Sequence, residues 1–529
     1  MTESTDNIEG AREAVSREPG NTAEDTAEET VKAGRREWIG LLVLLLPALI
    51  VSMDNTVLFL AMPFFSADLE PTGSQLLWIL DSYGFLLAGL LITMGSLGDR
   101  IGRRRLLVLG AAAFGAASLL AAFARTPEML IGARVLMGIA AATLAPSTLS
   151  LIRNMFHDPQ QRTTAIGAWT AAFGGGAMVG PIIGGFLLEN FWWGSVFLIN
   201  VPVMVLLLVL APLLLPEFRD PEAGRFDLIG AALSLLSVLA VIYGIKRLAE
   251  DGFDAVPVAA IGVGVIAGVL FLHRQRRPGA LVDVSLFRDR AFGMSMATNT
   301  LALFAMVGSG LFAAQYLQLV LGMRPFTAAL WSMVSVVGMV VAATAAPMLV
   351  RSVLPAYIVG VGLLIAAGGF LLITQAETDS GPVMIVAGSA VMTLGLGMVL
   401  TLASDMILSA APPERAGAAS GLSETGSELG GALGIAILGS VGTAVYRSRL
   451  AEHVPPGLPA EAADAARDTL GGAVQVAGQL PADTGGELLR VARQAFTEGM
   501  HLSAFAAAGV VIVTAVLAVV LLRNVRIGE

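Results

Sequence analysis

The sequence lacks cysteine altogether, which excludes disulfides, thiolate catalysis and zinc–thiolate sites. Lysine is nearly absent too, because Lys32 and Lys246 are the only lysines among the 32 basic residues. The four histidines are scattered along the chain, and there is no Walker Gly-x-x-x-x-Gly-Lys sequence. We therefore expect no metal site, no bound cofactor and no ATP-driven motor.

Charged residues are also few, at 14% of the chain, whereas 55% of the residues are hydrophobic. A soluble globular protein carries about 25% charged residues. The charges here are concentrated between apolar runs of about 20 residues, the length that crosses the hydrocarbon core of a bilayer. The composition predicts an all-α polytopic membrane protein embedded in lipid.

The net charge of -9 comes from two polar segments. Residues 1–37 hold ten acids and five bases, and residues 450–500 hold seven acids and three bases. The rest of the chain is neutral overall, so we expect no nucleic-acid partner. Because residues 1–37 have almost no large apolar side chains and no signal-peptide pattern, we expect a disordered acidic tail there.

Fourteen apolar spans follow from Trp38 onward. Alternate loops, beginning with the loop after span 2, carry fifteen arginines up to span 13, whereas the other loops carry few basic residues. The positive-inside rule therefore predicts that both termini are cytoplasmic. The few basic residues assigned to the other loops are Arg125, Lys246, Arg247 and Arg324.

The last long loop, residues 450–500, lies on the outer side by parity. It contains two stretches with helical apolar periodicity, Ala460–Ala477 and Gly485–Phe496, separated by Pro481. These stretches predict two short helices that form an extracellular hairpin. Its acidic side chains either attract cations or form an ordinary solvated surface.

Glycines at helical spacing indicate close helix contacts and an internal repeat. The run Gly174–Gly185 in span 5 is echoed eight spans later by Gly426, Gly430, Gly431 and Gly434. This offset predicts two six-helix bundles, residues 38–216 and 291–522, with two inserted helices in residues 226–273. Parallel repeats of this kind are typical of secondary transporters with a central site.

The loop after span 2 reads G-S-L-G-D-R-I-G-R-R-R from Gly95 to Arg105. It resembles the G-x-L-x-D-R-x-G-R-R signature of the major facilitator superfamily, where this loop is a cytoplasmic conformational latch. The resemblance assigns the latch to Gly98, Asp99, Arg100, Gly102 and Arg103.

Further segments resemble the fourteen-helix drug:proton antiporters of this superfamily, which include bacterial exporters of quaternary ammonium compounds and dyes. They are M-D-N-T-V from Met53, W-I-L-D-S-Y at 78–83, R-V-L-M-G from Arg134, G-G-G-A-M-V-G-P-I-I-G-G from Gly174, and S-E-T-G-S-E-L-G at 423–430. The resemblance implies a proton-coupling motif and an antiporter motif. Their residues are Arg134 and Gly138, and Gly176, Gly180, Pro181, Gly184 and Gly185.

The resemblance implies a multi-pass protein of the bacterial cytoplasmic membrane that exports lipophilic cations, such as ethidium, by alternating access. It further implies that the proton gradient drives export, that the partners are small molecules and protons, and that no obligate protein partner is needed. The alternatives are an exporter of one endogenous compound or antibiotic, an uptake symporter, and a sensor or scaffold without transport activity. None of these is an enzyme.

Acids within the spans are the expected sites for protons and substrate cations, because an unpaired carboxylate in the membrane interior is costly. Asp54 lies about 24 Å along span 1, too deep to reach water at the membrane surface, and pairing with Arg134 is the alternative. Glu424 and Glu428 share one helix face. Asp81 lies early in span 2, where simple solvation is the alternative.

Aromatic and methionine side chains can line a pocket for lipophilic cations. Packing inside the bundle or contact with lipid is the alternative for each of them. Met339 also stands where relatives that handle divalent cations carry an acid, so we expect weaker recognition of dications. The candidate lining residues are Met53, Trp78, Tyr83, Trp169, Phe173, Tyr316, Trp331 and Met339.

Overall fold

The computed structural model describes residues 33–219, 227–251, 254–275, 284–350, 352–411, 416–453 and 459–523. Within these ranges the chain is helical and contains no β-strand. Among the described residues, fourteen helical spans are long and apolar enough to cross a membrane. The predicted all-α polytopic fold is thereby confirmed. Residues 1–32 of the predicted acidic tail lie outside the described residues, and Arg35 already begins the first helix.

The first bundle contains six spans, the last of which is formed by two consecutive helices. Thr72, Thr126 and Asp158 each cap the helix that follows them by accepting a backbone N–H hydrogen bond. Prolines in the first turn start two of these helices, α4 and α5. The elements are α1 (Arg35–Leu69), α2 (Gly73–Ile101), α3 (Arg103–Ala122), α4 (Pro127–Met155), α5 (Pro159–Asn190), α6 (Ser195–Leu198) and α7 (Asn200–Leu214).

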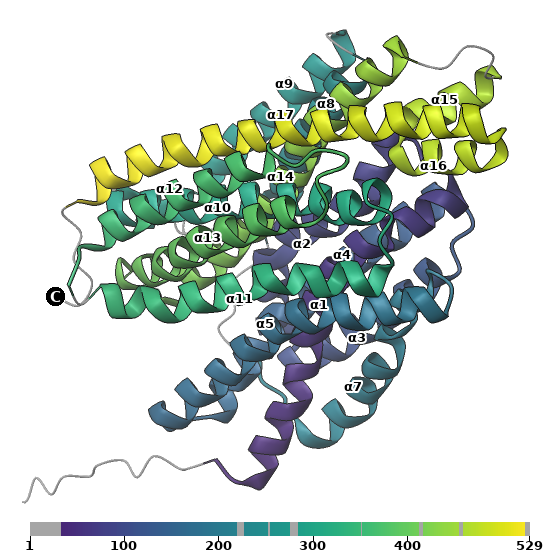
Figure 1. The fold of residues 1–529 in the computed structure, drawn as a ribbon. Helices are drawn as coiled ribbons and strands as arrows, with labels where there is room; N and C mark the ends of the chain where they lie inside the picture. The colour runs from purple at the N-terminus through teal and green to yellow at the C-terminus, as the bar shows by residue number, and fades with distance from the viewer. Residues whose placement is uncertain are drawn as a thin grey trace, which may run out of the picture.

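Two inserted spans, α8 (Leu228–Asp251) and α9 (Ala255–Arg274), pack against each other, and α8 also contacts α2 and α14 (Figure 1). The assignment of Lys246 and Arg247 to a loop was wrong, because both residues lie inside α8. The polar sequence after Ile245 continues the helix for more than a turn.

The second bundle also contains six spans. Its elements are η1 (Val284–Arg288), α10 (Arg290–Gln315), η2 (Tyr316–Val320), α11 (Pro325–Leu349), α12 (Pro355–Ile373), α13 (Val383–Ser409), α14 (Ala416–Glu452) and α17 (Ala482–Leu522). The π-helical turn η2 extends α10 into a single span.

The segment between α14 and α17 differs from the expected hairpin. Its first part forms two short helices, α15 (Ala460–Asp468) and α16 (Leu470–Gln479), because Thr469 interrupts the helix and caps α16. The expected second helix is not separate, since Gly485–Phe496 belongs to the long helix α17. Pro481 starts that helix, and nothing between Phe496 and the apolar span breaks it.

Rows of glycines allow close contacts between equivalent pairs of helices, one pair within each bundle. On α5, Cβ atoms added at Gly176, Gly180 and Gly184 would collide with α1, and α14 has an equivalent glycine row facing α10. The α14 row comprises Gly426, Gly430 and Gly434. The repeat predicted from glycine spacing therefore corresponds to a repeated close contact, α1 with α5 and α10 with α14.

The two bundles touch at the end of the molecule where α15 and α16 lie (Figure 1). Gly73 of α2 lies against Thr443 of α14, and Gly471 of α16 lies against Ser66 of α1. The side chain of Gln475 also donates a 2.7 Å hydrogen bond to Glu70 at the end of α1. Toward the opposite end, where α1 begins and α17 ends, the helices of the two bundles diverge (Figure 1).

Candidate functional site

Asp54 is buried at the centre of the first bundle and forms an ion pair with Arg134 of α4. The Asn200 side chain of α7 donates a 3.3 Å hydrogen bond to the other carboxylate oxygen, and donates to Ser118 of α3 at 3.2 Å. The carboxylate is therefore contacted by side chains from two other helices, α4 and α7, and Ser118 of α3 contacts it only through Asn200. The pairing that the sequence left as an alternative is present.

Arg134 connects this carboxylate to α2. Its Nε donates a 3.2 Å hydrogen bond to the backbone oxygen of Ile79, and its guanidinium lies over the Tyr83 ring, 4.4 Å from the ring centre. Gly138, one turn further along α4, allows the close approach, because a Cβ there would collide with the Tyr83 backbone. One buried cation thus contacts α1 and α2 while belonging to α4.

The Tyr83 hydroxyl is fully buried and has no hydrogen-bond partner among the described residues. It lies within electrostatic range of Asp54 and Arg134 in the first bundle and of Glu428 in the second. Tyr83 therefore interacts electrostatically with predicted acids of both bundles.

Asp81 is also fully buried, so the solvated alternative is wrong for this residue. One of its carboxylate oxygens lies 2.7 Å from Nζ of Lys246, which is buried as well. The Lys246 ammonium lies 4.3 Å from the centre of the Trp78 ring. Sequence reasoning missed Lys246 as a site residue, although its rarity as one of two lysines was a usable signal.

Glu424 and Glu428 lie one turn apart on α14 and are both partly exposed. Among the described residues, the structure assigns neither side chain an ion pair, and the two carboxylates interact electrostatically with each other. Between them, Ser427 accepts a 2.8 Å hydrogen bond from Asn299 and fixes this part of α14 on α10. These two acids differ from Asp54 and Asp81 in having no internal cation beside them.

The candidate lining residues are not gathered in one place. Trp169 of α5 donates a 3.1 Å hydrogen bond to Thr148 of α4 and stacks on Phe173, with ring centres 5.8 Å apart. Met53 is buried under Gly180. Tyr316 donates through its hydroxyl to the backbone oxygen of Glu377, in the connection between α12 and α13.

On α11, Trp331 is partly buried and Met339 is exposed. Because its hydroxyl bonds the connection between α12 and α13, Tyr316 is a structural anchor near the bundle end rather than part of a central wall. Trp78 and Tyr83 face cations supplied by the chain itself, Lys246 and Arg134.

The loop predicted to be a latch is organised by two ion-pair systems within the first bundle. Arg103 pairs with Asp99 at 2.5 Å, and its backbone N–H donates to the oxygen of Phe218 at 2.9 Å. Gly102 has φ +109°, a conformation that favours glycine, and the Glu217 carboxylate lies directly against it. Glu217 is a residue that the sequence motif did not single out.

Glu217 also accepts a hydrogen bond from the backbone of Arg104 at 3.1 Å, and it lies 3.6 Å from the guanidinium of that residue and 3.7 Å from that of Arg105. The turn after Gly98 and Arg100 is thereby fastened to the segment that follows α7.

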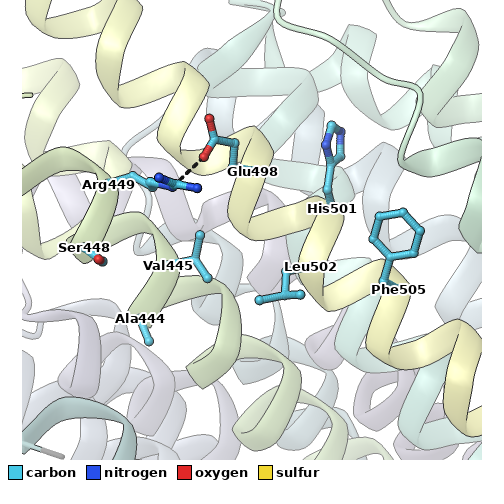
Figure 2. A pocket seen from close by; sticks show the side chains of 8 residues that line it. All are labelled: Ala444, Val445, Ser448, Arg449, Glu498, His501, Leu502 and Phe505. Atoms are coloured by element: carbon cyan, nitrogen blue, oxygen red, sulfur yellow. Dashed lines mark ion pairs between the residues drawn. The ribbon is translucent and has the colours of Figure 1, made fainter. Parts of the chain in front are cut away.

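A separate cleft lies between α14 and α17, and none of the four predicted acids lines it. Figure 2 shows Arg449 of α14 paired with Glu498 of α17, and these atoms are 2.8 Å apart. Leu502 and Phe505 form its apolar part and are largely exposed. The lining residues are Ala444, Val445, Ser448, Arg449, Glu498, His501, Leu502 and Phe505.

The profile of the Major Facilitator Superfamily matches residues 44–435. The chain belongs to the major facilitator superfamily. The "Multidrug efflux pump LfrA" of Mycolicibacterium smegmatis is 42% identical to it over 505 residues, which cover 95% of this chain and 100% of that protein. The "Methyl viologen resistance protein SmvA" of Salmonella typhimurium is 36% identical, covering 87% of this chain and 93% of that protein.

Among solved structures, a bacterial homolog of the human lysosomal transporter Spinster superposes with a TM-score of 0.64 at 18% identity, covering 93% of this chain and 98% of that one. This likeness confirms the predicted major facilitator fold. The family match, the similarity to efflux pumps and the apolar spans together make the chain a transporter of small molecules rather than an enzyme, and a multi-pass protein of the inner membrane.

Proposed function

We propose that this major facilitator protein is a proton-coupled antiporter that exports lipophilic cations by alternating access, with both termini in the cytoplasm. The relatives named for multidrug efflux and for methyl viologen resistance support the substrate class, because methyl viologen carries two quaternary nitrogens. The proton gradient would supply the energy, with about 2.3 kcal/mol per charge per 100 mV when net charge moves.

The observation that carries the proposal is the buried Asp54–Arg134 ion pair. A proton that binds Asp54 removes the negative charge from this pair and leaves Arg134 without its counter-ion. Because Arg134 also bonds the backbone of Ile79 and covers the Tyr83 ring, loss of the pair alters the packing of α1, α2 and α4 together. Protonation thereby favours one arrangement of these helices over the other.

The second bundle supplies the complementary element. Glu424 and Glu428 are partly accessible and lack an internal cation, so a substrate cation can provide their missing positive charge. The electrostatic interactions of Tyr83 with both Glu428 and Asp54 support coupling between the two bundles. Protons and the substrate cation then compete for the same carboxylates.

The cycle begins in the arrangement described above, in which the bundles touch at the α15–α16 end. In the proposed orientation this end is extracellular, so the acids face the cytoplasm and take up a cation. After the bundles switch, external protons neutralise the acids and release the cation. The protonated carrier returns and gives its protons to the cytoplasm.

Ethidium transport into everted membrane vesicles tests the proposal, because ethidium is a lipophilic monocation with a fluorescent readout. We expect ethidium uptake that depends on a pH gradient with the vesicle interior acidic, and that stops when an ionophore dissipates this gradient. Asp54→Asn vesicles should show no gradient-dependent uptake. Gradient-driven movement in the opposite direction would indicate a symporter, and binding without any movement would indicate a sensor.

A further inference from the structure

Lys246 is the described lysine that lies inside the membrane bundle, and its surroundings have the chemistry of a cation-binding site. Its ammonium is 2.7 Å from Asp81 and 4.3 Å from the centre of the Trp78 ring, with the Phe85 ring centre 6.0 Å away. A carboxylate beside aromatic faces is the combination that binds organic cations in proteins. Here a side chain of the protein itself occupies that place.

The site is assembled from three helices. Asp81, Trp78 and Phe85 belong to α2, Lys246 belongs to α8, and Ala436 of α14 completes the apolar cluster around them. Both bundles and the inserted span therefore meet at this ion pair. A change in the position of Lys246 therefore alters the packing between α2 and α14, the helices through which the two bundles touch here.

Further hydrogen bonds do not complete the Asp81–Lys246 ion pair among the described residues. The second carboxylate oxygen of Asp81 is buried and has no hydrogen-bond partner among the described residues. A cavity with room for about one water molecule reaches Lys246 between α2 and α14. Its wall includes the Ser440 hydroxyl, which is also buried and lacks a partner among those residues.

Unused acceptors and adjacent space permit the ammonium to move without a large rearrangement of helices. The long, unbranched lysine side chain has four carbons between Cα and the charge, so the ammonium can swing away while α8 stays in place.

We propose that Lys246 is a tethered cation that occupies a binding subsite for the exported cation, and that substrate displaces it from Asp81 and Trp78. This inference rests on the proposed export of cations. Lys246 compensates the Asp81 charge in the empty carrier, and its return expels the substrate. It is thus a specificity-determining residue, because only a cation that replaces the ammonium beside a carboxylate and an indole ring gains access.

The first experiment measures the reactivity of Lys246 in the wild-type protein. Membranes are treated with a small amine-acylating reagent with and without saturating ethidium, and the labelled lysines are quantified by mass spectrometry. Lys32, the other lysine in the sequence, is an internal control in the same chain. We expect ethidium to raise the labelling rate of Lys246 at least threefold and to leave that of Lys32 unchanged.

The Asp81→Asn variant completes this experiment. Without the carboxylate, Lys246 should react rapidly even in the absence of ethidium, and ethidium should add little. An ethidium-bound wild-type protein in which Lys246 reacts no faster than in the empty protein would overturn the inference. If wild-type protein neither binds nor exports ethidium, the proposed export function is wrong. If it exports ethidium but the reactivity of Lys246 does not change, only the inference about Lys246 is wrong.

The second experiment measures ethidium affinity in purified variants. Lys246→Gln removes the internal competitor, so we expect binding about tenfold tighter than wild type and slower release during efflux. Arg247→Gln removes the adjacent positive charge of α8 and is the matched control, for which we expect affinity within twofold of wild type. Unchanged or weaker binding in folded Lys246→Gln protein would contradict the role of Lys246 as a competitor.

Discussion

The Glu189 side chain, at the end of α5, accepts a 3.2 Å hydrogen bond from the backbone N–H of Phe326, at the start of α11. This bond crosses between the two bundles. Beside it, a Cβ added at Gly185 would collide with the Phe326 backbone. Because alternating access requires the bundles to separate at each end in turn, contacts of this kind must break when the α15–α16 end opens.

Cross-linking across this end should stop transport. The Cβ of Ser66 on α1 lies 3.2 Å from the Cβ position of Gly471 on α16, close to the separation found in disulfides. The cysteine-free sequence allows Ser66→Cys and Gly471→Cys to be introduced without background thiols. We expect oxidation to abolish efflux and reduction to restore it, as measured with ethidium in vesicles.

Each single-cysteine variant serves as a control and should remain active after oxidation. Efficient cross-linking with undiminished efflux would mean that α1 and α16 stay together throughout the cycle.

The contribution of the sequence differs between backbone contacts and side-chain partners. Glycine spacing predicted close helix contacts, and Gly176, Gly180 and Gly184 indeed lie against α1. The prediction works because regularly spaced glycines in a membrane helix mainly allow a neighbouring backbone to approach closely. Lys246 could not be placed in the same way. The polar residues after it resemble a loop, and only the packing of α8 against α2 shows that this lysine points inward.

Asp54→Asn should abolish proton-driven efflux and also lower stability. The substitution leaves Arg134 buried without its carboxylate partner, and breaking a buried ion pair costs about 3–5 kcal/mol. Thermal unfolding in detergent and drug-induced proton release measure the two effects separately. Asn200→Ala is the matched control, since it removes a polar neighbour of Asp54 but no charge.

We expect Asn200→Ala to retain proton coupling with a modest loss of stability, since a single hydrogen bond contributes about 1 kcal/mol. Wild-type proton release in folded Asp54→Asn protein would refute the assignment of Asp54 to proton coupling.

Changes in the latch should slow cycling more than they weaken substrate binding. Arg103→Ala and Asp99→Asn break the 2.5 Å ion pair, and Glu217→Gln weakens the attachment of the same turn to the segment after α7. All three positions lie at the opposite end of α2 from Asp81, so ethidium affinity should stay within about threefold. Efflux rates in proteoliposomes should fall about tenfold.

Binding that is lost while efflux continues at the wild-type rate would exclude a latch. Glu217 is informative here because the motif names only residues of the loop, whereas the positive φ of Gly102 brings the loop backbone against this distant carboxylate.

The aromatic residues show why a binding pocket is harder to predict than a fold. Residue type alone marked Trp78 and Tyr83 as possible partners of a substrate cation. In the structure both rings face cations of the chain, and Tyr316 is fixed to the connection after α12. Which aromatic faces are vacant depends on side-chain packing, and periodicity carries no information about that.

The two acids of α14 should differ from Asp54 in how selectively they act. Glu424 and Glu428 lie on one face of the helix and have no ion pair among the described residues, so a dication can pair with both carboxylates at once. A monocation needs only one of them. Glu424→Gln should therefore reduce efflux of methyl viologen about tenfold, equivalent to about 1.4 kcal/mol, and reduce efflux of ethidium much less.

Efflux of both compounds by Glu424→Gln, Glu428→Gln and the double variant provides the measurement. Ethidium transport should survive either single substitution, because the remaining carboxylate still compensates one charge, and should be lost in the double variant. Asp54→Asn, by contrast, should stop both compounds alike, since its carboxylate serves the proton step. An equal loss of both compounds in Glu424→Gln would assign Glu424 to the proton step as well, and would leave substrate recognition to Glu428 and Asp81.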